Sequence, residues 1–406
     1  MTAVEQRNQQ ENRISYYGWT VTAMSFLANV VGYGIVFAFS VFLKPLAAEF
    51  NWSRSLTTGA FSLYALLHNI LAVFTGRLAD KFGPRVTMII AGLFIGFGTL
   101  LMMFIDSIWQ LYLFYGIFIA VGISCNYVPS MSTVSRWFHQ KRGLAIGITA
   151  GGLGAASVVF SPLSAWLITT YSWRIAYLIL GVACWLIFIP VVLLIRAAPT
   201  TQFATETKAA NTQLTGLSFA EARQTFTFWA YCLAWLFASF SEYAIMINIV
   251  PLVSDKGFSL VEASMVAAVI SISSFIGRVM GGFLSDKFGR KQIFTVSLVI
   301  QMLTFALLFL SQQILMLVLF AALFGLSMGG WTGVAPAFSA DYFGFRATGT
   351  ILGFALLIAS IGISTGPLVG SYFYDTMHSY DNMILICIMT TAIAIVFACL
   401  LKPVHK

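Results

Sequence analysis

Gly76-Arg-Leu-Ala-Asp80-Lys-Phe-Gly-Pro-Arg85 is a charged stretch that occurs twice in this chain with small changes. It returns as Gly282-Phe-Leu-Ser-Asp286-Lys-Phe-Gly-Arg-Lys291, about half of the 406-residue chain further on. Each copy follows one long apolar segment and precedes another. A duplicated charged loop between apolar segments is typical of an internally repeated membrane transporter.

The composition places the chain in a membrane. Hydrophobic residues make up 59% and charged residues only 9% of the sequence, which is not the composition of a soluble domain. Apolar runs of 18 or more residues predict membrane-spanning helices, and the sequence contains twelve of them. We therefore expect an all-α membrane protein with twelve transmembrane helices in two pseudo-symmetric six-helix bundles.

The polar segments divide the chain into five parts. The longest polar stretch lies near the middle and is rich in Thr, Ala and Gln. We expect an N-terminal tail at 1–14, a first bundle at 15–196, a central loop at 197–224, a second bundle at 225–402 and a C-terminal tail at 403–406.

The basic residues predict the orientation. Most of the 22 Lys and Arg fall on the side that holds both termini and the central loop, while the loops on the other side hold only Lys44, Arg54, Arg174 and Lys256. This bias predicts cytoplasmic termini in an inner or plasma membrane. The net charge of +8 therefore needs no nucleic-acid partner, which would require a basic face on a soluble domain.

Further landmarks repeat at nearly the same offset and carry a family resemblance. Trp137-Phe138 is echoed by Tyr342-Phe343, and Ser161-Pro162 by Gly366-Pro367. Two homologous halves, with G-x-L-x-D-K-F-G-x-R after the second and eighth spans, resemble the major facilitator superfamily. The stretch that starts Trp137-Phe-His-Gln-Lys141-Arg142-Gly-Leu-Ala is similar to monocarboxylate transporters and oxalate/formate exchangers. So are Gly18-Trp19, Phe42, Phe50-Asn-Trp-Ser53 and Asn126-Tyr-Val-Pro129.

Arg278 is the candidate for substrate binding. It lies in the eighth span, eight residues before Asp286, or ~12 Å at ~1.5 Å per residue. A cation at that depth costs at least ~2.5 kcal/mol, so it must face a wet cavity or a partner. The guanidinium matches a carboxylate, and the matching position in the first half is Ala72. The alternative is an Arg that pairs with a backbone carbonyl or with Glu242. The resemblance implies anion binding by Arg278.

Two titratable residues are candidates for proton coupling. Glu242 is the carboxylate in the middle of a span, and a desolvated Glu can carry a proton at neutral pH. It could instead be the counter-charge of Arg278 or a locally hydrogen-bonded residue. His68 lies in the second span at a comparable depth and could change charge near physiological pH. The alternative for His68 is a buried hydrogen-bonded residue.

The remaining candidates rest partly on the resemblance. Spans one, four, eight and ten supply possible substrate contacts, for which ordinary helix packing is the alternative: Tyr33, Phe37, Asn126, Tyr127, Ser274, Met328 and Thr332. For Trp331, packing is favoured. The resemblance also implies that the charges of the repeated loop gate one side of the carrier: Asp80, Arg85, Asp286 and Arg290.

The sequence departs from the family at informative positions. Proton-coupled animal members carry an Asp where Ser274 stands and a Lys where Phe37 stands. The oxalate exchanger has a second cation in the eleventh span, and this chain has none around Ala359. One fixed cation suits a monovalent carboxylate better than a dianion, and Glu242 or His68 would have to carry the proton.

These features predict a secondary active transporter. We expect a small monocarboxylate such as lactate, pyruvate, acetate or formate to bind Arg278 between the halves, with proton symport by alternating access. The alternatives are an organic-anion exchanger and an exporter of another small molecule. An enzyme is disfavoured, because no nucleophile–base pair, metal-ligand spacing or cofactor loop occurs. We expect no cofactor and no metal; the partners are an organic anion, the proton and the lipid bilayer, and the protein is expected to work as a monomer.

Overall fold

The computed structural model describes residues 3–138, 142–197, 216–344 and 346–402. Within these ranges the chain is helical, and its only bridge between extended residues joins Gly216 to Gly344. Twelve helical segments are long and apolar enough to cross a membrane, which confirms the predicted fold class. Predictions for residues 1–2, for 198–215 of the central loop and for 403–406 lie outside the described residues.

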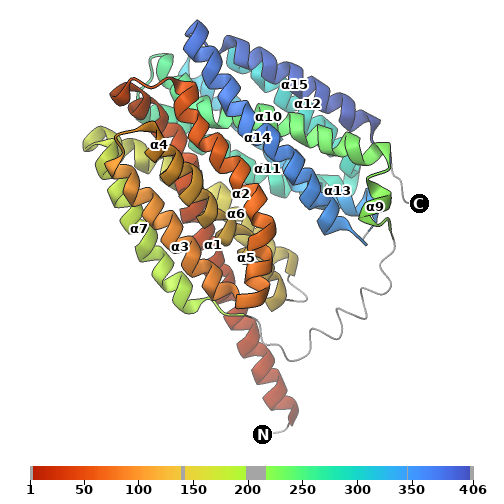
Figure 1. The fold of residues 1–406 in the computed structure, drawn as a ribbon. Coiled ribbons are helices and arrows are strands. Elements are labelled where there is room, and N and C mark those ends of the chain that lie inside the picture. Colours follow the sequence, from red (N-terminus) through yellow and green to blue (C-terminus); the bar gives the residue numbers. More distant parts are fainter. Residues whose placement is uncertain (1–2, 139–141, 198–215, 345, 403–406) are drawn as a thin grey trace. The chain divides into compact units, whose positions relative to one another are not determined.

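The first six spans contain long helices and two composite spans, the third and the fourth (Figure 1). Helix α1 begins within the predicted tail, and the fourth span is built from α4, η2 and α5 in succession. The elements are α1 (Ala3–Phe50), α2 (Arg54–Phe82), α3 (Pro84–Leu101), η1 (Met102–Phe104), α4 (Ile108–Leu111), η2 (Tyr112–Ile119), α5 (Ala120–Trp137), α6 (Arg142–Thr170) and α7 (Trp173–Leu194).

The last six spans follow a short helix that ends the central loop. This helix starts at a capping box, in which Ser218 donates its backbone N–H and its hydroxyl to Glu221 and so lowers the pKa of that carboxyl group. The elements are α9 (Phe219–Ala222), α10 (Phe226–Asp255), α11 (Leu260–Phe288), α12 (Arg290–Leu310), α13 (Ile314–Phe343), α14 (Thr348–Met377) and α15 (Asp381–Leu400).

The glycine of the repeated phrase explains part of its duplication. Gly83 and Gly289 have positive φ angles of 82° and 94°, and each lies between the end of one span and the start of the next. This region of φ is strained for residues with a Cβ atom, so glycine is favoured at such helix ends. Both copies of the repeated stretch therefore form the same kind of sharp connection between two helices.

The chain forms two compact units. The first contains residues 1–39 and 67–199, and the second contains 40–66 and 200–406. The sequence boundaries placed residues 40–66 with the first bundle, whereas their contacts in the structure are with the second unit. The reason is a cluster of ion pairs and hydrogen bonds around Arg54, described below.

In the first unit, α3 lies between α5 and α7 (Figure 1). Trp185 of α7 donates its indole N–H to the carbonyl oxygen of Gly92 on α3, over 3.1 Å. Asn126 of α5 donates its amide to the carbonyl oxygen of Ala28 and to Asn29 on α1, over 3.0 and 3.2 Å. These hydrogen bonds hold α7 against α3 and α5 against α1.

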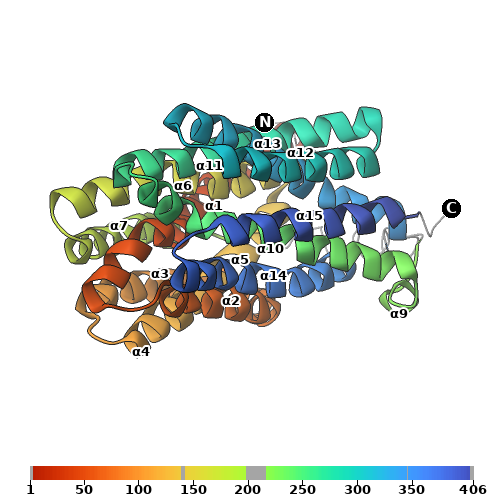
Figure 2. The same cartoon turned by 90° about the horizontal axis from the view of Figure 1, so that it is seen from above.

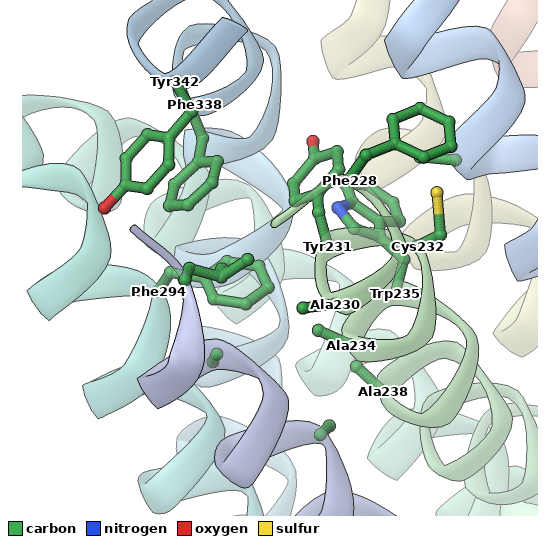
Figure 3. Close-up of a cluster of buried hydrophobic side chains, with 14 of the residues drawn as sticks. Phe228, Ala230, Tyr231, Cys232, Ala234, Trp235, Ala238, Phe294, Phe338 and Tyr342 are labelled. Carbon is green, nitrogen blue, oxygen red and sulfur yellow. The ribbon is translucent and has the colours of Figure 1, made fainter. Parts of the chain in front are cut away.

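In the second unit, α11 and α12 pack on α13, and α14 and α15 pack on α10 (Figure 2). A cluster of buried aromatic side chains joins α10, α12 and α13 (Figure 3). Within it, the ring centroids of Tyr231 and Phe338 are 5.3 Å apart, and those of Phe338 and Tyr342 are 4.0 Å apart, both stacked. This cluster packs α10 and α13 together through their aromatic side chains.

Candidate functional site

The backbone around Arg278 is held by a glycine face on the neighbouring helix. Gly325, Gly329 and Gly333 recur every fourth residue of α13. A Cβ atom added to Gly329 would lie 2.7 Å from the backbone nitrogen of Arg278, and one added to Gly333 would lie 2.9 Å from its carbonyl oxygen. Small residues at this spacing let two membrane helices approach closely. Any side chain on this face would therefore displace Arg278.

The Arg278 side chain is half-buried and incompletely satisfied. Its Nε atom is buried without a hydrogen-bond partner, as is the hydroxyl of Ser274 one helical turn earlier. Buried polar groups are normally paired, so two unpaired donors on one face of α11 indicate a place for an external acceptor. A carboxylate has the charge and the lone pairs that this face requires.

Glu242 of α10 carries another buried polar atom without a hydrogen-bond partner. Its side chain is 4% exposed, its Oε2 atom has no hydrogen-bond partner, and it feels the attraction of the Arg278 charge. The ion pairs found in the described part of the chain do not include one between these two residues. The cation and the carboxylate therefore influence each other without neutralising each other by contact.

Two further candidates lie on α13. Met328 is 6% exposed, and Thr332 is half-buried with its hydroxyl donating to the carbonyl oxygen of Met328 over 2.8 Å. Trp331, for which packing was favoured, is 1% exposed and donates its indole N–H to Gln301 over 2.9 Å. The hydroxyl of Thr332 is thus already used within its own helix.

The first unit brings its aromatic candidates together. The ring centroid of Tyr33 lies 6.0 Å from that of Phe37, 6.5 Å from that of His68 and 5.6 Å from that of Tyr127. Asn126, next to Tyr127, is fully buried, and its amide is used to bind α1. Tyr127 therefore groups with the other rings, while Asn126 serves helix packing.

The charges of the repeated loop find partners that the sequence reasoning missed. Asp80 pairs with Arg136 in the first unit. In the second unit, Arg290 pairs with Asp341 and lies 3.3 Å from Asp286. Arg136 and Asp341 occupy matching positions just before the Trp137 and Tyr342 landmarks, with opposite charges. This match between the two halves was the sequence signal from which the ion-pair partners could have been predicted. Arg85 is exposed.

A second arginine, Arg54 at the start of α2, is buried and has several partners within the second unit. Its guanidinium makes a two-pronged ion pair with Asp255, and one nitrogen also donates to the hydroxyl of Tyr380 over 2.7 Å. The guanidinium carbon lies 3.5 Å from the ring centroid of Tyr374. Lys44 also pairs with Asp255, over 2.9 Å.

The start of α2 is also capped by another helix. Asp375 of α14 accepts the backbone N–H groups of Arg54 and Ser55, each over 2.8 Å, and the hydroxyl of Ser55 over 2.6 Å. A carboxylate is stabilising at a helix N-terminus. Burial raises the pKa of Tyr380 well above its ordinary value, so its phenol remains neutral beside Arg54. These contacts bind residues 40–66 to the second unit.

Comparison with known proteins agrees with this architecture. The family model described as Major Facilitator Superfamily matches residues 25–279 and 231–406. A crystal structure of a bacterial homolog to the human lysosomal transporter Spinster has a TM-score of 0.77 at 18% identity, covering 94% of this chain and 97% of that one. At this identity, the likeness shows that the two proteins share a fold.

Two curated relatives align along most of their length. Monocarboxylate transporter 13 of Rattus norvegicus is 26% identical, with 90% of this chain and 84% of the relative covered. The oxalate:formate antiporter of Oxalobacter formigenes is also 26% identical, with 95% and 91% covered. Because the family model spans most of the chain, this protein belongs to the major facilitator superfamily and is an integral membrane transporter.

Proposed function

We propose that this protein carries small monocarboxylates, such as lactate, pyruvate, acetate or formate, by alternating access with proton symport. The observation that supports this most directly is the unpaired Nε of Arg278 beside the unpaired hydroxyl of Ser274. Both donors can bind one carboxylate, and the Arg supplies a charge that does not depend on pH. The alignments with monocarboxylate transporters support the same substrate class.

Glu242 is the proton carrier in this proposal. It is buried, its Oε2 is unpaired, and it senses the charge of Arg278. When an anion binds Arg278, the attraction that favours the ionised form of Glu242 weakens, which makes protonation of the carboxyl group easier. The loaded site then holds one anion and one proton, which avoids the cost of carrying net charge through the membrane. His68 is the alternative carrier in the first unit.

The other candidate residues have supporting roles in this proposal. In the first unit, the grouped rings of Tyr33, Phe37 and Tyr127 are the proposed substrate contacts, and in the second unit Met328 and Thr332 lie on the helix whose glycine face packs on Arg278. Asn126 is assigned to packing. We assign gating of the carrier to the loop charges of each unit: the paired Asp80 with the exposed Arg85 in the first, and the paired Asp286 and Arg290 in the second.

Organic-anion exchange is the second candidate. The relative from Oxalobacter formigenes, an oxalate:formate antiporter, supports it. An exchanger would use Arg278 in the same way but would not need protonation of Glu242. An inward proton gradient therefore separates the two mechanisms, because it accelerates net uptake only in a symporter.

The test is transport by the purified protein in liposomes. Counterflow of labelled formate, acetate, pyruvate and lactate is measured with and without an inward acid gradient. We expect a carboxylate signal that the gradient accelerates in net uptake. Uptake of amines or sugars with no carboxylate signal would contradict the proposal.

Replacing Arg278 tests the binding role. Arg278→Ala should reduce carboxylate counterflow at least about tenfold, because a charge-assisted hydrogen bond contributes ~1.5–3 kcal/mol. Arg174→Ala is the matched control, since Arg174 packs its guanidinium 4.2 Å from the ring of Trp173 and lies outside the site. Equal activity of the Arg278 variant and this control would remove Arg278 from the proposal.

A further inference from the structure

Gln301 of α12 joins the helix that carries Glu242 to the helix that packs on Arg278. Trp331 of α13 donates its indole N–H to Gln301 Oε1 over 2.9 Å, and Gln301 Nε2 donates to the hydroxyl of Ser241 on α10 over 3.2 Å. The three side chains are between 0% and 1% exposed. Because an indole nitrogen only donates, it fixes which end of the Gln301 amide faces α13.

The chain of hydrogen bonds continues to a backbone carbonyl. Ser241 accepts a second hydrogen bond from Thr391 of α15 over 2.9 Å and donates its own proton to the carbonyl oxygen of Ala238 over 3.0 Å. The hydroxyl of Ser241 is therefore fully used. Fully satisfied polar networks in a low-dielectric interior rigidify the elements they connect. This network joins α10, α12, α13 and α15 to one another at the same position along their lengths.

The network lies next to Glu242 in the chain and next to the glycines that pack on Arg278. Glu242 follows Ser241, so the rotation of α10 that the network imposes at Ser241 also sets the direction of Glu242. On α13, Trp331 lies between Gly329 and Gly333, whose backbone contacts Arg278. Trp235, labelled in Figure 3, lies 5.0 Å from Trp331 between ring centroids and gives α10 and α13 a second contact.

We propose that Gln301 is a positioning residue that sets the separation between the Glu242 carboxylate and the Arg278 guanidinium. It touches neither group and acts through Ser241 and Trp331. The inference rests on the proposed function, because the separation matters where binding of an anion at Arg278 is coupled to protonation of Glu242. The energy of that coupling varies inversely with the distance between the charges, so a looser network changes the pH dependence of uptake.

The test uses Gln301→Leu in the full-length protein in liposomes. Uptake of labelled pyruvate, which stays ionised from mildly acidic to neutral pH, is measured across that range. We expect the pH profile to shift by at least about half a pH unit and the maximal rate to fall, with KM changed less than about twofold, because the substrate contacts remain. Thr304→Val should keep the wild-type profile, because the buried Thr304 hydroxyl donates only to the backbone carbonyl of Gln301 and not to the side chains of the network.

A double variant separates positioning from general destabilisation. In a Glu242→Gln background, measured by pyruvate counterflow, adding Gln301→Leu should cause no further change, because interacting residues are non-additive. An equal loss in both backgrounds would overturn the proposal. If Gln301→Leu is not monodisperse in detergent, Thr391→Val removes one donor to Ser241 and should shift the profile in the same direction by less; a wild-type profile there would overturn it too.

The outcomes also distinguish the two proposals. A wild-type protein that moves no carboxylate refutes the proposed function and this inference with it. Carboxylate uptake that is lost in Arg278→Ala but keeps its wild-type pH profile in Gln301→Leu refutes the role of Gln301 alone.

Discussion

Arg54, which is buried, and Arg278, which is half-buried, are two arginines of the same unit with opposite surroundings. Arg54 has an aspartate, a tyrosine hydroxyl and an aromatic face as partners. Arg278 has an Nε atom without a hydrogen-bond partner, and Glu242 attracts it without an ion-pair contact. Both carry a positive charge out of bulk water, but only one has its guanidinium fully matched by the fold.

The difference separates a structural cation from a binding one. A buried ion pair becomes strongly destabilising when one partner is removed, because the other charge stays buried and unpaired. A cation without such a partner stabilises the fold little and has its donors available to a ligand. Loss of Arg54 should therefore affect stability, whereas loss of Arg278 should affect transport.

The largest expected effect on stability is that of Arg54→Ala. It leaves Asp255 with Lys44 as its remaining ion-pair partner and removes the contact with Tyr374. We expect the free energy of unfolding to fall by about 3 kcal/mol, measured by SDS-induced unfolding in mixed micelles. Arg174→Ala is the control for loss of an arginine stacked on an aromatic ring. Equal unfolding curves for the two variants would show that the Arg54 cluster stabilises nothing.

A smaller effect is expected for Arg54→Lys. Lysine keeps the charge, but it lacks the planar fork that engages both oxygens of Asp255 and stacks on Tyr374. The free energy of unfolding should fall by about 1–2 kcal/mol, between the wild type and the alanine variant. Stability equal to the wild type would mean that charge alone explains the cluster.

The smallest effect on stability is expected for Arg278→Leu. The substitution replaces a half-buried cation whose Nε is unpaired by an apolar group, so the free energy of unfolding should change by less than about 1 kcal/mol or should rise. The same unfolding assay and carboxylate counterflow are measured on one preparation. A loss of stability as large as that of Arg54→Ala would erase the contrast and make Arg278 a structural residue.

Much of the fold could be predicted from the sequence because its signals are local. Apolar runs indicate membrane spans, and the copies ending at Gly83 and Gly289 mark matching helix connections. The choice of Arg278 came from the same reasoning, since one charge in an apolar run, with Ala72 at the matching position, stands out without any structure.

The partners of these residues could not be predicted, because each contact joins segments far apart in the chain. Nothing near Arg54 in the sequence indicates Asp255 or Tyr380, and nothing near Ser241 indicates Gln301. The glycine face of α13 was open to prediction from its four-residue spacing, but its contact with Arg278 was not.

The sequence by itself determined the twelve spans, the duplication and the one-sided charge of Arg278, because hydropathy and repetition are written residue by residue. Only the tertiary structure decided which arginine is satisfied and which retains an unpaired donor. It also decided that residues 40–66 belong with the second unit. Those outcomes depend on the distances between side chains of different helices, and hydropathy does not encode such distances.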